Sequence, residues 1–198
     1  MDPAKWGATT WWFEHWLANK VDSVIMSSRA QGHVGESDTK FQLDLLKLFV
    51  DFIVPFNEEL IPCQSCQKSS RVFMRVLSPK DILKTFRSTH QPTASRFVHD
   101  LHNIVNQKLK KPQFTPEQFH DFSSSTEFQT FPLANLEYIA SAIEHCLNKW
   151  KIPRKHKLFV TAFSKYLAPL LVSLHNNASL ANLTSAQRQY LQRHYMRI

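Results

Sequence analysis

The chain has 198 residues, of which 43% are hydrophobic, so it can bury a core and disorder is not the default expectation. Its formal charge of +8 favours anionic partners, but a charge of this size also keeps a small protein in solution. Three cysteines are too few for a secreted disulfide scaffold, and we find neither a signal-peptide pattern nor a membrane-spanning run. We therefore expect an intracellular protein without a transmembrane segment.

Helical periodicity is the main signal in the N-terminal part. The sequence has only 3 glycines against 15 phenylalanines, which argues against a turn-rich β-fold. Residues 9–28 repeat apolar side chains at helical spacing behind a capping residue, Thr9 or Thr10. A loop with two glycines follows at 29–37. These patterns predict an all-α fold.

Prolines and polar caps mark the elements that follow. Residues 37–53 are predicted to form a second helix, which Pro55 ends or kinks. A short helix is expected after Pro79, and a longer one begins at the cap Thr93 and stops by Pro112.

The composition changes after this long helix. Residues 112–132 are rich in Pro, Ser and Thr, which indicates a boundary or an extended connector. Three further helical patterns follow, at roughly 133–150, 154–177 and 184–196.

Cys63 and Cys66 form a C-x-x-C pair behind Pro62, in the opening turn of a helix predicted over 62–77. Structural zinc sites use four Cys or His ligands, and the chain has no second short-spaced pair, so we expect no metal. Redox chemistry suits the position better, because the unpaired N–H groups and the dipole of a first helical turn stabilise a thiolate. Two buried cysteines that merely pack remain the structural alternative.

Three segments in a fixed order carry a family resemblance. They are "WGATTWWFEH" at 6–15, "PCQSC" at 62–66 and "HNIVNQKLKKPQF" at 102–114. Together they resemble the Erv/ALR family of FAD-dependent sulfhydryl oxidases, whose members carry G-x-[ST]-T-W-x-x-x-H, then P-C-x-x-C, then H-N-x-V-N-x-K-L-x-K-P-x-F. The resemblance covers about residues 5–116 and implies a four- to five-helix bundle that binds FAD.

The resemblance also implies which residues hold the cofactor. From the first helix it assigns Gly7, Thr10, Trp11 and His15 to FAD. From the later helix it assigns Phe97, His102, Asn103, Val105, Asn106, Lys108 and Lys111, with the lysines near the phosphates. His102, Val105 and Asn106 also share one helical face by their spacing, an unusual mixture for a core stripe. Without the resemblance, His102 and Asn106 would be interpreted as satisfied core polar residues.

The chain departs from the family at several positions. Many members have Arg where Ala8 stands, Trp where Phe97 stands and an aromatic residue where Ile61 stands. Many members also carry a structural disulfide, whose matching positions here are His99 and Pro116. The resemblance therefore implies that this second disulfide is missing.

The residues beyond the resemblance are expected to form a second part. We predict an oxidase domain over 1–116 and, over 117–198, a helical extension that packs on it or builds an oligomer interface. Extended viral relatives are a reasonable comparison, and a viral member would act in the cytoplasm or nucleus of an infected cell or in the virion. Family members commonly dimerise, so the resemblance also implies a homodimer.

The implied activity is thiol oxidation. A substrate thiolate attacks Cys63, Cys66 passes the electrons to FAD, and O2 takes them to form H2O2. Cys146 is the remaining cysteine, so a shuttle pair is missing and the donor is expected to be a separate dithiol protein, such as a thioredoxin-like one. The alternative is a non-enzymatic helical adaptor that binds nucleic acid or a protein partner through basic residues such as those at 149–157.

Overall fold

A computed structural model describes residues 3–129 of the chain, and every regular element in this range is helical. The elements are α1 (Pro3–Ala30), α2 (Glu36–Pro55), the π-helix η1 (Phe56–Leu60), α3 (Gln64–Leu77), α4 (Lys80–Thr89), α5 (Ala94–Lys108), α6 (Pro116–Ser124) and α7 (Thr126–Gln129). The prediction of an all-α fold is confirmed. The three helical patterns predicted after residue 132 lie outside the described residues.

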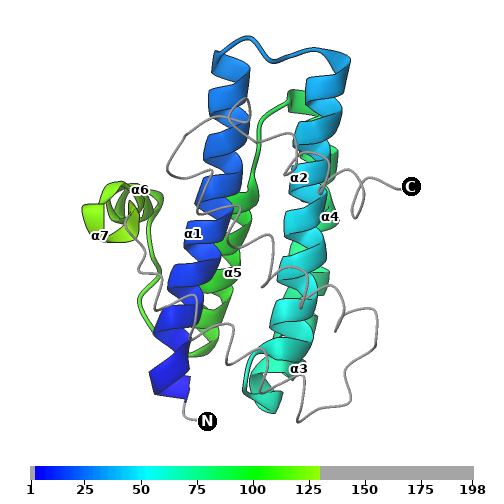
Figure 1. Ribbon diagram of the computed structural model, residues 1–198. Helices are drawn as coiled ribbons and strands as arrows, with labels where there is room; N and C mark the ends of the chain where they lie inside the picture. Colours follow the sequence, from blue (N-terminus) through cyan, green and yellow to red (C-terminus); the bar gives the residue numbers. More distant parts are fainter. Residues whose placement is uncertain (1–2, 130–198) are drawn as a thin grey trace.

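The two longest helices, α1 and α2, run antiparallel and are joined by a loop at one end of the bundle (Figure 1). α5 packs along α1, α4 packs against α2, and α3 contacts both η1 and α5. α6 and α7 lie on the outer side of α1 (Figure 1). Within residues 3–129, none of the helices combines the length and the apolar character needed to span a bilayer.

Apolar faces of α1, α2 and α5 supply most of the core, and aromatic side chains fill much of it. The largest side chains that are fully buried include Phe13, Trp16, Phe49, Phe52, Phe86 and Phe128. Burying one large apolar side chain contributes about 1.5–3 kcal/mol. The apolar residues that recur at helical spacing in the sequence are therefore the ones that the fold buries.

A carboxylate on α1 fixes the start of α5. The Oδ1 atom of Asp22 accepts a hydrogen bond from the backbone N–H of Ala94 at 3.1 Å, and its Oδ2 accepts one from Ser95 at 2.8 Å. The first N–H groups of a helix need such acceptors. Thr93 is the N-cap residue, as predicted, but its side chain makes no capping hydrogen bond. Burial raises the pKa of Asp22 to about 6, although the hydrogen bonds from Ser95 and Ala94 oppose this.

The stretch predicted as a connector contains a helix. Thr115 and Gln118 exchange the two hydrogen bonds of a capping box, and Pro116 occupies the first position of α6. The aromatic side chains of this short helix turn toward α1, because the ring of Phe122 meets that of Trp12 edge-on at 4.9 Å. The chain after residue 115 therefore packs on the bundle as far as the described residues extend.

Candidate active site

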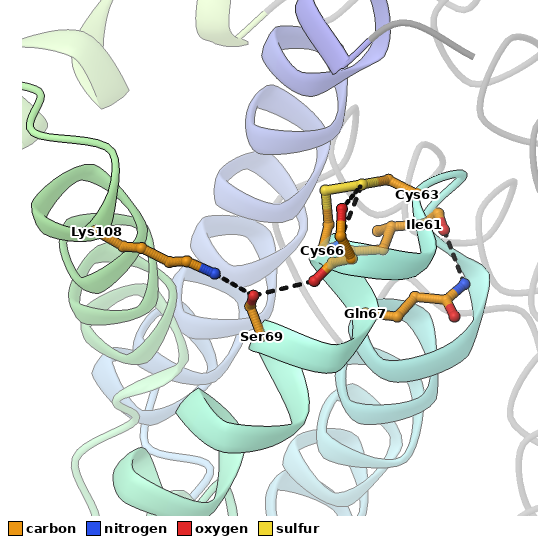
Figure 2. Close-up of a disulfide and its surroundings, with 7 residues drawn as sticks. Ile61, Cys63, Cys66, Gln67, Ser69 and Lys108 are labelled. Atoms are coloured by element: carbon orange, nitrogen blue, oxygen red, sulfur yellow. Dashed lines mark hydrogen bonds between the residues drawn. A yellow bond between two sulfur atoms is a disulfide. The ribbon is translucent and has the colours of Figure 1, made fainter.

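Cys63 and Cys66 are joined in a disulfide at the start of α3 (Figure 2). Cys63 is the N-cap residue of this helix and Cys66 lies in its first turn. Pro62 therefore precedes the helix and does not occupy the first helical position predicted for it, because the chain reaches Cys63 in an extended conformation. Both sulfur-bearing side chains are half-buried, so the pair is covered but reachable.

The sulfur of Cys63 lies among hydrogen-bond donors. Its Sγ accepts a hydrogen bond from the backbone N–H of Cys66 at 3.2 Å and lies 3.2 Å from the hydroxyl oxygen of Ser65. The first turn of α3 contains no acidic residue, so the positive end of the helix dipole is not neutralised there. In the reduced pair, these groups stabilise a thiolate on Cys63.

Trp11 and His15 on α1 face His102 on α5. The indole ring of Trp11 stacks on the His102 imidazole with centroids 4.2 Å apart and planes 8° apart. The Nε2 atom of His15 lies 3.0 Å from Nδ1 of His102, so one of these nitrogens donates to the other. The remaining ring nitrogen of His15, Nδ1, is buried and has no hydrogen-bond partner within the described residues.

The two histidines are uncharged near neutral pH. The pKa of His15 is lowered to about 3, mainly by burial and to a smaller extent by the neighbouring His102 and His99. Burial also lowers the pKa of His102 to about 4, together with the charges of His99 and Lys111. These imidazoles can therefore bind through stacking and neutral hydrogen bonds rather than as cations.

Aromatic rings of α6 and of the segment before it cover the histidine pair. The ring of Phe119 lies 5.0 Å from that of His15 and 5.7 Å from that of His99. The ring of Phe114 lies 6.5 Å from that of His102. α6 therefore shields the junction of α1 and α5 from one side and adds to the burial that is the main cause of the low pKa values of His15 and His102.

Hydrogen bonds connect α5 to the chain entering α6. The side chain of Asn103 accepts a hydrogen bond from the Phe114 backbone N–H and donates one to the Phe114 carbonyl, both at 2.8 Å. The Nε2 atom of His99 donates to the same carbonyl at 2.7 Å. These hydrogen bonds tie α5 to the segment that leads into α6.

Two lysines that the family resemblance assigns to FAD lie at the end of α5 and just after it. The Nζ atom of Lys108 contacts the hydroxyl of Ser69, one turn after Cys66 on α3 (Figure 2). The same atom lies 5.8 Å from the ring centroid of Phe73, so Lys108 joins α5 to α3. Lys110 has a φ of 55°, and this left-handed residue turns the chain so that the Lys111 backbone N–H donates to the Asn106 carbonyl at 2.9 Å. Lys111 is thereby held near the end of α5.

Only some of the residues that the resemblance assigns to FAD contact one another in the structure. Trp11, His15 and His102 meet, and Asn103 is bound to the α6 entrance. Of the other predicted residues, Thr10 and Phe97 are buried, Gly7, Val105 and Asn106 are half-buried, and Lys111 is exposed. Among the described residues, no group of three or more His, Cys, Asp or Glu could hold a metal ion.

A buried acid that the sequence analysis missed connects α1 to η1. Glu14 is 0% exposed, and its Oε1 accepts a hydrogen bond from Nδ2 of Asn57 at 3.1 Å. Burial raises the pKa of Glu14 to about 8, although the hydrogen bond from Asn57 opposes the shift, so the side chain is mostly neutral at pH 7. The one available signal was its position as the only acid in the apolar run 11–18.

Comparison with known proteins agrees with this geometry. Residues 8–124, more than half of the chain, match the Erv1/Alr family. No curated protein and no solved structure matches the chain. Members of the matched family are FAD-linked sulfhydryl oxidases that act on dithiols. With its disulfide at the start of α3 and the paired histidines of α1 and α5 inside the matched region, the chain belongs to the Erv1/Alr family.

Proposed function

We propose that this chain is a FAD-dependent thiol oxidase, which forms disulfides in protein substrates and passes the electrons to O2 to give H2O2. The observation that supports this most is the half-buried Cys63–Cys66 disulfide at a helix N-terminus, in a chain of the Erv1/Alr family. The donors around the Cys63 sulfur would stabilise the thiolate that forms there when the disulfide opens. The partners in this proposal are a reduced dithiol protein and O2.

The residues between α1 and α5 fit FAD. Trp11 and His102 offer flat rings on which a planar ligand can stack, and the buried Nδ1 of His15 offers a hydrogen bond that the described residues leave unused. Lys108 and Lys111 offer cations for phosphate groups. We assign the cofactor contacts to Gly7, Thr10, Trp11, His15, Phe97, His102, Asn103, Val105, Asn106, Lys108 and Lys111. When bound, FAD supplies the two-electron acceptor chemistry that amino-acid side chains lack.

The cysteines carry out the exchange with substrate. A substrate thiolate attacks the sulfur of Cys63, the bond between the two cysteines breaks, and Cys66 leaves as a thiolate. The second thiolate of the substrate then attacks the substrate sulfur that is bonded to Cys63. This closes the substrate disulfide, and Cys63 leaves as a thiolate held by the Cys66 N–H and the Ser65 hydroxyl. Two thiols have become one disulfide, and two electrons reside on the cysteine pair. Transfer of these two electrons, with two protons, to O2 would give H2O2, and FAD held by the residues named above would supply the chemistry for that transfer.

The proposal is tested by measuring O2 uptake, H2O2 and free thiols together, with dithiothreitol and with a reduced thioredoxin-like protein as donors. We expect one H2O2 and one disulfide for each O2 consumed. Cys63→Ser should abolish uptake, because the attacked sulfur is gone. A FAD-loaded wild-type protein that consumes no O2 with either donor would contradict the proposal.

The wider organisation of the chain is part of the same proposal. We propose an oxidase domain over 1–116, an extension over 117–198, a homodimer and a viral setting, all of which rest on the resemblance. Of the extension, the structure describes residues 117–129, and these pack on α1. Cys146 and the basic segment 149–157 of the adaptor alternative lie outside the described residues.

A further inference from the structure

The turn that presents Cys63 follows a π-helix, and π-helical turns are frequent at functional sites. The backbone N–H of Ile61 donates to the carbonyl of Phe56, five residues earlier, and closes η1. The N–H of Cys63 then donates to the Ile61 carbonyl at 2.7 Å. The last carbonyl groups of a helix lack partners from the helix itself, so this turn needs donors from elsewhere.

Gln67 supplies two of these hydrogen bonds. Its Nε2 donates to the Glu59 carbonyl at 2.9 Å and to the Ile61 carbonyl at 3.0 Å. An amide nitrogen carries two hydrogens, so both are used. Gln67 is only 7% exposed and follows Cys66 directly in the sequence, and Figure 2 shows it beside Ile61 and the disulfide.

Arg71, one turn further along α3, extends the same contact. Its Nη2 donates to the Glu58 carbonyl at 2.9 Å. Two side chains of α3 therefore hold three backbone carbonyls of the segment from which Cys63 emerges. Because Cys66 lies on α3 itself, these hydrogen bonds tie the segment that leads into Cys63 to the helix that carries Cys66, independently of the disulfide.

We propose that Gln67 is a positioning residue for the redox pair: it keeps the turn at 59–61 against α3, so that Cys63 and Cys66 stay within bridging distance after their disulfide opens. The proposal rests on the proposed function of this disulfide as a redox pair. Two thiols held close together have a high effective concentration for one another, which favours the disulfide. Loss of the two hydrogen bonds therefore shifts the exchange equilibrium toward the reduced pair.

The test uses the full-length protein in anaerobic glutathione buffers, with the reduced fraction of the pair counted by thiol alkylation and mass spectrometry. Gln67→Met keeps the length of the side chain and removes both donors. We expect its exchange constant to shift about tenfold toward the dithiol, which corresponds to a reduction potential higher by about 30 mV. Gln91→Met, the same change at an exposed glutamine between α4 and α5, should leave the constant unchanged.

A second measurement separates positioning from a merely structural role. A residue that only stabilised the fold would lower the free energy of unfolding equally in the oxidised and reduced proteins, whereas Gln67→Met should lower it more in the oxidised protein. A folded Gln67→Met protein with the wild-type exchange constant overturns the proposal. If Gln67→Met does not fold, Gln67→Glu takes its place, and failure of both to fold also overturns it.

Failure of the Gln67 proposal and failure of the proposed oxidase activity can be told apart. The glutathione equilibrium requires neither O2 nor turnover. A shifted constant in a protein that consumes no O2 would therefore support the positioning role of Gln67 and contradict only the oxidase.

Discussion

The indole ring of Trp11 stacks on the imidazole of His102 at 4.2 Å, and His102 in turn lies 3.0 Å from His15. These contacts join α1 to α5 with rings rather than with aliphatic side chains alone. Both histidines are uncharged near neutral pH, since burial holds the pKa values of His15 and His102 at about 3 and 4. The junction therefore offers flat, neutral surfaces, which suit a planar ligand.

Replacing Trp11 by Ala should weaken FAD binding, because it removes the flat ring that lies against His102. Aromatic stacking contributes about 0.5–1.5 kcal/mol beyond area burial, so we expect the Kd for FAD to rise by a factor of about 2 to 13. Flavin fluorescence titration measures this Kd. Trp12→Ala is the matched control, because Trp12 packs on Phe122 instead. Equal weakening by both variants would mean that general destabilisation is the cause.

The two cysteines should be inequivalent in the FAD-loaded protein. Cys63→Ser leaves Cys66 as the thiolate beside the flavin, which should give a broad absorbance band at long wavelength. Cys66→Ser should give no such band. Visible spectra of the two variants measure this, and bands in the reverse order would show that the roles of the two sulfurs are exchanged.

Glu14 should make stability depend on pH. Its folded pKa of about 8 exceeds the ordinary value of 4.5, so its contribution is fully present below pH 4.5 and is lost as the pH rises through 8. Between pH 6.5 and 8 this loss reaches up to about 1.4 kcal/mol per pH unit. The window lies above the folded pKa values of Asp22, His15 and His102, but the histidines of the unfolded chain titrate at its lower end, at their ordinary pKa of 6.5, and Lys20 at its upper end, because burial lowers its pKa to about 8. The difference between the wild type and Glu14→Gln therefore isolates the contribution of Glu14.

Urea unfolding at several pH values in this window measures the effect. The free energy of unfolding of the wild type should fall as the pH rises. In Glu14→Gln it should stay nearly level, because the amide keeps the shape of the acid and cannot ionise. Parallel slopes for the two proteins would show that another group is responsible.

Much of the fold follows from periodicity in the sequence, but the site does so only in part. The apolar period of 9–28 predicts α1, yet α1 begins at Pro3, ahead of the predicted Thr9 or Thr10 cap. α6 was not predicted, because Pro, Ser and Thr around it indicated a connector. The sequence does contain its start signal, the capping pair Thr115 and Gln118. Element starts depend on single side-chain contacts, which periodicity does not show.

The roles of Glu14 and Gln67 could not be predicted for a different reason. The partner of Glu14 is an amide on η1, and the partners of Gln67 are backbone carbonyls. Backbone acceptors leave no residue pattern in a sequence, and a π-helix has no strong signature of its own. The cysteine pair was found because its spacing and its helix start are both local features.

Removing the chain after residue 116 should cause aggregation or loss of FAD. The truncation deletes Phe119 and Phe122, whose rings cover His15 and Trp12, and exposes an apolar face of α1. Light scattering and the flavin content of the purified fragment measure the outcome. A soluble, flavin-bound and active fragment would instead show that the extension is an independent module.

Cys146→Ser should leave the oxidase rates nearly unchanged with both dithiothreitol and a reduced protein substrate. A single further thiol cannot form a shuttle disulfide within one chain, so substrate thiols are expected to reach Cys63 directly. Oxygen uptake by the folded variant measures this. Selective loss of protein oxidation would identify Cys146 as part of an intermolecular shuttle.

The most direct test of the proposed oxidase is an anaerobic titration of the FAD-loaded protein with dithiothreitol, followed by its visible absorbance. We predict that the oxidised flavin band of the wild type is lost with about one to two equivalents of dithiol, since the disulfide and the flavin each accept two electrons, and that admitting O2 restores the band and releases H2O2. In Cys66→Ser the band should persist, because the pair can no longer pass electrons on. A wild-type flavin band that dithiol does not bleach, or that bleaches equally in Cys66→Ser, would contradict the claim that Cys63 and Cys66 carry the electrons.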